Sequence, residues 1–176
     1  SFDIETTSFY RDADGETYSY ERYMKLGGKS TKMEKCSLMY VWQFGINGFC
    51  IMGRTWDEFL QVLSEVVDIL ELCQKKRIII YVHNLAYEFQ FFRELLEWEK
   101  VFSIDLRKPI YGITKTGLEF RCSYLLSGYS LAKLGEQLHA YKCEKLVGDL
   151  DYSLLRHSKT PLTQKEIGYC LNDIKV

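Results

Sequence analysis

The chain has 176 residues, which suits one domain because domains typically run to about 100–200 residues. Apolar residues make up 47% and aromatic residues 15%, which excludes a disordered tail or linker. The 23 Lys and Arg residues are balanced by 24 Asp and Glu residues. This argues against a broad basic surface for nucleic acid, but not against a nuclease that gathers carboxylates around cations.

The apolar runs and the two ends of the chain indicate the cellular location that we expect for the protein. The longest apolar run, Ile78–Val82, is far shorter than the roughly 20 residues of a membrane span, and no signal peptide opens the chain. The chain starts inside an expected strand and stops inside an expected helix. We therefore expect residues 1–176 to be a single domain, excised or truncated from a larger cytoplasmic protein. The six cysteines form no C-x-x-C pair, as expected of reduced intracellular thiols.

The first third of the chain predicts strands. Residues Ser1–Glu5 begin a strand, and the tyrosine-rich segment 8–35 predicts a long loop or an irregular hairpin. The stretch Cys36–Ile46 is rich in strand formers. Asn47-Gly48 then predicts a tight turn into a partner strand at Phe49–Arg54.

The middle of the chain predicts helices around a buried strand. A capping box at 55–58 opens a helix that we expect to reach about Cys73. The run Arg77–Val82 lacks alternation, which is typical of a parallel strand buried on both faces. The next helix is expected over about Ala86–Glu99.

The last third predicts a mixture of short elements before a final helix opened by a second capping box at 163–166. In chain order, these are a strand at Val101–Leu106, a hairpin of Ile110–Thr114 and Leu118–Ser123, a helix at Ser130–Tyr141 and a turn or short strand at Gly148–Tyr152. A strand meander followed by crossovers to a buried strand predicts an α/β fold. We expect the ribonuclease H-like plan, with a mixed sheet of the five-stranded type, flanking helices and a β-hairpin insertion.

Carboxylates recur at places where they could meet. Asp3 and Glu5 lie two residues apart on one face of the first strand, and Tyr169 and Asp173 share a face of the last helix. Glu88 follows the buried strand, at the end where ligands of open α/β sheets gather. Taken alone, each pattern is also what solvated side chains or a helix N-terminus would give.

Together, these residues suit two-metal hydrolysis of a phosphodiester bond. Two cations about 3.5–4 Å apart stabilise the attacking and leaving oxygens, and Tyr169 would orient the attacking water. Asn84 can donate and accept hydrogen bonds, and Tyr87 and Phe91 can stack on bases.

Three motifs in this order resemble the exonuclease motifs of family B DNA polymerases. They are D-I-E-T-T at 3–7, Y-V-H-N-L-A-Y-E-F at 81–89 and Y-C-L-N-D at 169–173. The protein-primed polymerases of small tailed phages and linear plasmids are the most similar branch. V-W-Q-F-G, W-D-E-F at 56–59 and G-D-L-D-Y at 148–152 also resemble stretches of that family, so the likeness covers nearly the whole chain.

The resemblance implies a proofreading 3′–5′ exonuclease domain with a ribonuclease H-like fold, in a phage-infected or host bacterial cell. It implies two divalent ions, Mg²⁺ or Mn²⁺, held by Asp3, Glu5, Glu88 and Asp173, with Tyr169 orienting the water. It implies that the 3′ end of single-stranded DNA is held by Thr6, His83, Asn84, Tyr87 and Phe91. The implied partners are this DNA end, the polymerase domain of the same chain and, near His83, the terminal protein; no membrane is implied.

The chain departs from the family pattern at three places. Glu88 stands where the family has Asp, so the reach of the carboxylate is longer by about 1.5 Å. The serine-leucine substrate motif is here Ser123-Tyr124, and the family's basic residue before G-D-x-D-Y falls on Val147, with Lys145 expected to replace it. Two alternatives stay open: a free-standing DEDD-type exonuclease acting on RNA or oligonucleotides, and a non-catalytic domain that binds single strands or the terminal protein.

Overall fold

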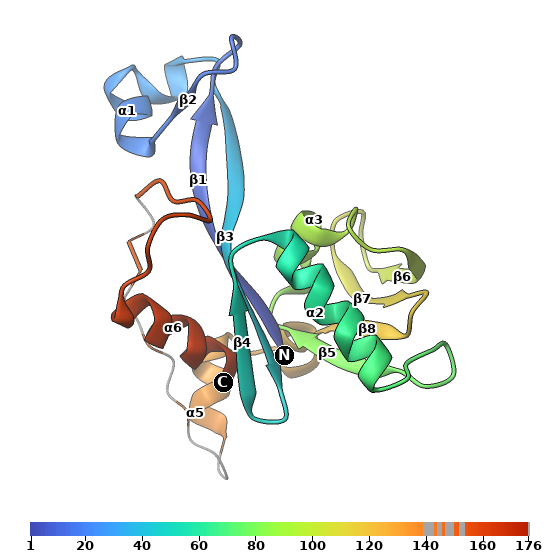
Figure 1. The fold of residues 1–176 in the computed structure, drawn as a ribbon. Helices are drawn as coiled ribbons and strands as arrows, with labels where there is room; N and C mark the ends of the chain where they lie inside the picture. Colours follow the sequence, from blue (N-terminus) through green and yellow to red (C-terminus); the bar gives the residue numbers. More distant parts are fainter. Residues whose placement is uncertain (139–142, 144–145, 147–149, 152–153, 176) are drawn as a thin grey trace.

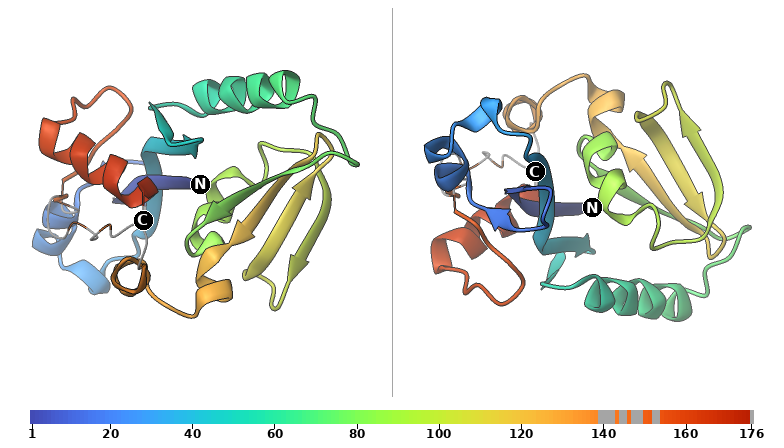
Figure 2. Two further views of the ribbon diagram at one scale, coloured as in Figure 1. Left: turned by 90° about the horizontal axis from the view of Figure 1, so that it is seen from below. Right: turned by 90° about the horizontal axis from the view of Figure 1, so that it is seen from above.

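The computed structural model describes the chain except for residues 139–142, 144–145, 147–149, 152–153 and 176. It is a mixed α/β fold in which helices flank one sheet (Figures 1 and 2). Across this described part, no helix is both long enough and apolar enough to cross a membrane. The strands are β1 (Phe2–Arg11), β2 (Thr17–Tyr18), β3 (Glu34–Ile46), β4 (Phe49–Gly53), β5 (Ile78–Val82), β6 (Trp98–Ser103), β7 (Pro109–Thr114) and β8 (Leu118–Cys122). The helices are α1 (Tyr20–Lys25), the 3₁₀ turn η1 (Gly28–Ser30), α2 (Trp56–Ile69), α3 (Leu85–Phe92), α4 (Ser123–Ser127), α5 (Leu131–Gln137) and α6 (Gln164–Lys175).

The sheet follows the order β4-β3-β1-β5-β8-β7-β6, with β2 paired to β1. Strands β4, β3 and β1 are antiparallel neighbours, whereas β5 runs parallel to β1 and β8 runs parallel to β5. This meander followed by parallel strands confirms the α/β class predicted from the sequence. The five-stranded estimate was too small, because the antiparallel strands β7 and β6 continue the sheet beyond β8.

Strand β1 separates an apolar face from an acidic one. Phe2 and Ile4 enter the main core, where the Phe2 ring stacks on Phe59 of α2 at 4.6 Å between ring centroids. Because successive side chains of a strand point to opposite faces, Asp3 and Glu5 face the other side. That side is covered by α6, which packs against β3 and β1. The alternation therefore places the carboxylates between the sheet and the last helix.

Both predicted capping boxes are present. Thr55 Oγ1 accepts a hydrogen bond from the Glu58 backbone N–H, and the Glu58 carboxylate accepts one from the Thr55 N–H at 2.9 Å. Thr163 and Glu166 make the same reciprocal pair, with the Thr163 N–H donating at 2.7 Å. These bonds satisfy backbone donors that a helix start otherwise leaves without partners.

The segment 8–35 forms the hairpin alternative. Strand β1 does not end at Glu5 but continues to Arg11, and it pairs with the start of β3 from Glu34. The hairpin extends as an arm that carries β2 and α1 at its far end (Figure 1). The rings of Tyr10 and Tyr23 stack at 3.6 Å and hold α1 against β1. The arm thus has a small aromatic core of its own, which the polar composition of residues 8–35 did not predict.

The predicted helix over Ala86–Glu99 is too long. Helix α3 ends at Phe92, and β6 already begins at Trp98. The Trp98 ring packs on Phe89 and Phe92, and its Nε1 donates to the Arg93 carbonyl at 2.6 Å. Packing of this aromatic residue under the helix end turns the chain back into the sheet, ahead of the expected strand start at Val101.

Two further boundaries differ from the expectations, and one expected segment is not tested. Ser123 begins helix α4 instead of ending β8. In the segment Ser130–Tyr141, a helix is present at Leu131–Gln137, and residues 139–142 lie outside the described part. Most of the segment Gly148–Tyr152 also lies outside it. The hairpin predicted at residues 110–123 is confirmed by the antiparallel pairing of β7 with β8.

Candidate active site

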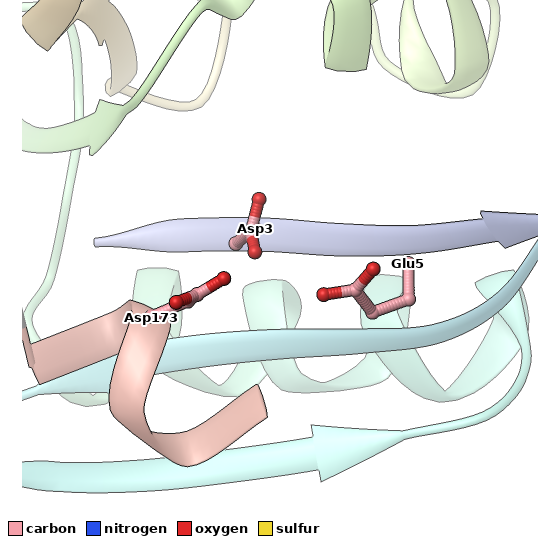
Figure 3. Close-up of side chains that lie close together, drawn as sticks. All are labelled: Asp3, Glu5 and Asp173. Carbon is pink, nitrogen blue, oxygen red and sulfur yellow. The ribbon is translucent and has the colours of Figure 1, made fainter. Parts of the chain in front are cut away.

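Three carboxylates meet between β1 and α6. One oxygen from each of Asp3, Glu5 and Asp173 lies within 4.8 Å of the others. Figure 3 shows the two β1 side chains and the Asp173 side chain turned toward a common space. Glu5 is buried, and Asp173 is only 9% exposed. Three acids drawn together in this way repel one another unless a cation or protons lie between them.

The backbone accounts for this meeting. Asp3 and Glu5 share a face of β1, and Asp173 lies on the helix that covers this face. A register shift between β1 and β3 at Glu5 and Thr6 then alters the pairing directly after the second acid. Bulges of this kind re-aim side chains and are frequent next to active sites.

Glu88 completes the acidic lining from the other side of the site. It lines one pocket of about 190 Å³ together with Asp3, Glu5, Tyr169 and Asp173. Its side chain is 5% exposed, and its Oε2 has no hydrogen-bond partner within the described part of the chain. Burial, with repulsion from Asp3 and Glu5 as smaller causes, raises the pKa of Glu88 to about 9. Glu88 stands outside the tight trio of carboxylates but faces the same pocket.

Strand pairing explains how α3 brings Glu88 there. Phe2 at the start of β1 pairs in parallel with Val82 at the end of β5. The residues after Val82 therefore run beside Asp3 and its neighbours. Asn84 takes the left-handed conformation at the N-terminus of α3, with φ of 67°, and makes no side-chain cap. Its amide thus stays available for a ligand instead of the helix start.

The expected substrate residues on α3 and β1 lie together. The hydroxyl groups of Thr6 and Tyr87 are hydrogen-bonded to each other. The ring of Tyr87 is 42% exposed and lies 5.3 Å from the ring of Phe91, centroid to centroid. This pair of aromatic side chains next to the carboxylates is the arrangement that bases stack on.

A second group borders the carboxylates at the ends of β5 and β8. His83 Nδ1 lies 3.1 Å from Ser123 Oγ, and the His83 ring meets the edge of the Tyr124 ring. His83, Ser123 and Asp173 line a pocket of about 300 Å³ beside Asp3. Tyr169 is 6% exposed and packs in the cluster beneath α6. Lys145 lies outside the described residues, so its expected role stays a prediction.

Two buried polar residues close to the site were not predicted from the sequence. Gln43 on β3 is wholly buried under α6, and Arg156 is buried near Tyr40, whose hydroxyl accepts a bond from Arg156 at 3.2 Å. Gln43 could have been noticed as the polar residue within the otherwise apolar run Met39–Phe44. Arg156 carried no local signal, because its partners lie far away along the chain.

The donor set fits hard divalent cations. Carboxylate oxygens are the ligands that Mg²⁺ and Mn²⁺ prefer. The buried Glu88 oxygen without a partner and the three crowded carboxylates are groups that such cations would satisfy. Asp3, Glu5 and Asp173 are close enough together to share one cation, and Glu88 lines the same pocket.

Comparison with known proteins gives a fold likeness. No family model matches the chain, and no curated protein matches it. A solved structure of phi29 DNA polymerase complexed with single-stranded DNA matches 99% of this chain, with a TM-score of 0.63 and 16% identity. The same polymerase with primer-template DNA matches at 17% identity and the same TM-score, and its ternary complex with incoming nucleotide at 16%.

The likeness covers a part of the polymerase. The chain spans 28–29% of the length of the polymerase chains that it matches. At this level of identity the comparison shows a shared fold. The carboxylate site described above is a separate observation, made on this chain's own residues.

Proposed function

We propose that this chain is a 3′–5′ exonuclease domain that removes nucleotides from the end of single-stranded DNA by two-metal catalysis. The observation that carries the proposal is the convergence of Asp3, Glu5 and Asp173 within 4.8 Å, facing a pocket that Glu88 also lines. The fold likeness to a DNA polymerase solved with single-stranded DNA supports it. So do the three motifs, since each of them contributes residues to the lining of this pocket.

The residues divide into two roles in this proposal. Asp3, Glu5, Glu88 and Asp173 would hold two Mg²⁺ or Mn²⁺ ions. When bound, such ions supply a water activated for attack and stabilise charge on the phosphate. Tyr169, buried beside the carboxylates, holds and orients the attacking water through its phenol.

The remaining residues would hold the DNA end. Tyr87 and Phe91 offer ring faces to the terminal bases, and the Thr6 hydroxyl fixes the phenol of Tyr87. Asn84, with no helix cap to make, offers its amide to a base or sugar. His83 and Ser123, hydrogen-bonded to each other, would contact the DNA end beside Asp3 and Asp173, and Lys145 would contact the phosphates.

In this proposal the domain is one part of a larger DNA polymerase. It would act beside a polymerase domain of the same chain, as a proofreading activity in a phage-infected bacterial cytoplasm. The terminal protein would contact the surface near His83. The motif resemblance, together with the fold likeness to a DNA polymerase, supports these proposed partners.

Degradation of a 5′-labelled single-stranded DNA tests the proposal. We expect a ladder of products shortened from the 3′ end with Mg²⁺ or Mn²⁺, none with EDTA, and none for Asp3→Asn. A phosphorothioate linkage at the 3′ end should delay the ladder. Binding without shortening would support the non-catalytic alternative, and faster shortening of RNA would support the free-standing exonuclease, because the 2′-hydroxyl is what a site can sense.

A further inference from the structure

The side chain of Gln43 is an unusual feature of the sheet beneath α6. It is 0% exposed, and within the described part of the chain neither its amide nitrogen nor its amide oxygen has a hydrogen-bond partner. Leaving a buried polar group without a partner costs about 1–3 kcal/mol. Val41, two residues away on the same face of β3, is apolar and equally buried. An apolar residue would fill this position without that cost, so packing alone does not account for the amide.

The register of the sheet locates the amide beside the acidic site. Gln43 lies directly opposite Asp3 in the antiparallel pair of β1 and β3. Side chains of opposed residues point to the same face, with Cβ atoms about 4.5–5.5 Å apart. Gln43 therefore stands on the face of the sheet that Asp3 and Glu5 occupy, one strand farther from the pocket.

Cys170 of helix α6 lies over the Gln43 side chain. The thiol of Cys170 is buried, and burial together with the charge of Glu5 raises its pKa to about 12. The Gln43 side chain opposes that rise in the pKa of the thiol, so the amide lies close to the thiol. Cys170 is one turn before Asp173 on the same face of the helix. The amide is thus enclosed by two of the elements that carry carboxylates.

We propose that Gln43 is a positioning residue for the carboxylate site, whose side-chain amide donates a hydrogen bond to the Asp3 carboxylate when the site holds its cations. The inference rests on the proposed function, because it requires a metal site at Asp3. Carboxylates that bind a metal are themselves hydrogen-bonded by groups behind them, and loss of such a group typically costs about 10–100-fold in metal affinity. The amide is the polar group of β3 that stands behind Asp3, so it can fix the direction of that ligand.

The test separates metal affinity from stability. The affinity for Mn²⁺ is measured by electron paramagnetic resonance of the free ion, and thermal stability is measured in EDTA. We expect Gln43→Leu to bind Mn²⁺ about tenfold more weakly. The same variant should unfold in EDTA at a temperature equal to or above that of the wild type, since it removes a buried amide without partners.

Two further variants keep the result interpretable. Gln43→Met, whose side chain has a similar length and no amide, should reproduce the affinity loss if Gln43→Leu fails to fold. Cys170→Ala removes the other neighbour of the amide and should bind Mn²⁺ within about twofold of the wild type, since it leaves the proposed bond to Asp3 intact.

The outcomes distinguish this inference from the proposed function. A wild-type chain that binds no Mn²⁺ overturns both. Wild-type binding that Gln43→Leu and Gln43→Met retain unchanged overturns the role of Gln43 alone. An equal loss of affinity in Cys170→Ala would show that packing under α6, and not the amide, controls the site, and would also overturn that role.

Discussion

Two buried glutamates of this chain meet opposite conditions. Glu88 lies 5% exposed among other acids, with one oxygen lacking a partner, and its pKa is raised to about 9. Glu166 is 7% exposed, yet the backbone N–H of Thr163, the Thr163 hydroxyl and the paired Arg156 hold its pKa below the ordinary value. The same type of side chain is thus buried among like charges at Glu88 and hydrogen-bonded to its neighbours at Glu166.

The difference between these two environments distinguishes a functional acid from an acid that stabilises the fold. Buried ion pairs with complete hydrogen bonding are common supports, whereas an acid buried beside like charges is a mark of functional sites. Arg156 joins Glu166 at the start of α6 to the Tyr40 hydroxyl, and its backbone N–H donates to Thr7 on β1 at 3.2 Å. This network holds α6 against β1, and so sets the distance between Asp173 and the β1 acids.

The largest expected effect is on catalysis at the acidic site. Asp3→Asn should lower the rate of Mn²⁺-dependent shortening of single-stranded DNA by more than about 100-fold, which exceeds the usual loss for a group behind the ligands. Glu88→Ala should also lower the rate strongly, and Glu88→Asp less. Glu119→Gln is the control, since that buried acid pairs with Arg121 on β8 and does not line the pocket. Near-wild-type turnover by Glu88→Ala would remove Glu88 from the site.

The next effect is on stability at the supporting pair. Arg156→Met leaves the Glu166 carboxylate buried without its cation, and removal of one partner from a buried pair typically costs about 3–5 kcal/mol. Urea denaturation should show this loss, and the double variant Arg156→Met with Glu166→Gln should recover part of it. A loss below about 1 kcal/mol would contradict a supporting role for the pair.

A pH effect of similar or smaller size is expected at Glu88. Its pKa is about 9 in the folded chain against an ordinary value of 4.5, so the folded chain holds an extra proton between these values. The free energy of unfolding in EDTA should therefore fall as pH rises, by about 3 kcal/mol from pH 5 to pH 7. Glu88→Gln should flatten this slope in thermal denaturation at pH 5, 7 and 9. An unchanged slope would mean that Glu88 is not the group responsible.

The smallest effect is on the hold of the DNA end. Stacking of a base on an aromatic side chain is worth about 1–3 kcal/mol, so Tyr87→Ala should weaken binding of single-stranded DNA about 5–150-fold. Fluorescence anisotropy in Ca²⁺ measures this without turnover. Tyr20→Ala, a tyrosine 49% exposed on the distant arm, is the matched control. Equal weakening by both variants would mean that Tyr87 does not hold the DNA end.

The sequence predicted what depends on local geometry. Asp3 and Glu5 share a face because a strand alternates, and Tyr169 and Asp173 share one because a helix repeats every 3.6 residues. Glu88 was found by its place after the buried strand, but a helix N-terminus explained it equally well. Its burial depends on the pairing of Phe2 with Val82, which no local pattern specifies.

The features that the sequence did not predict also depend on contacts between distant parts of the chain. Gln43 became notable only when the register set it opposite Asp3, and Arg156 only when a distant loop met α6. Helix α3 stops at Phe92 because Trp98 packs under its end, although the local sequence favours a longer helix. The strand pairing of the arm at residues 8–35 was not evident from its polar composition, because its core is a stack of only two tyrosines.

A crystal structure of the chain soaked with Mn²⁺, with anomalous differences recorded, tests the central claim most directly. We expect two anomalous peaks about 3.5–4 Å apart. One should be bound by Asp3, Glu5 and Asp173, and the other should be reached by Glu88 directly or through a water. Crystals at saturating Mn²⁺ that show no peak between β1 and α6 would contradict the claim that these buried acids form a metal site.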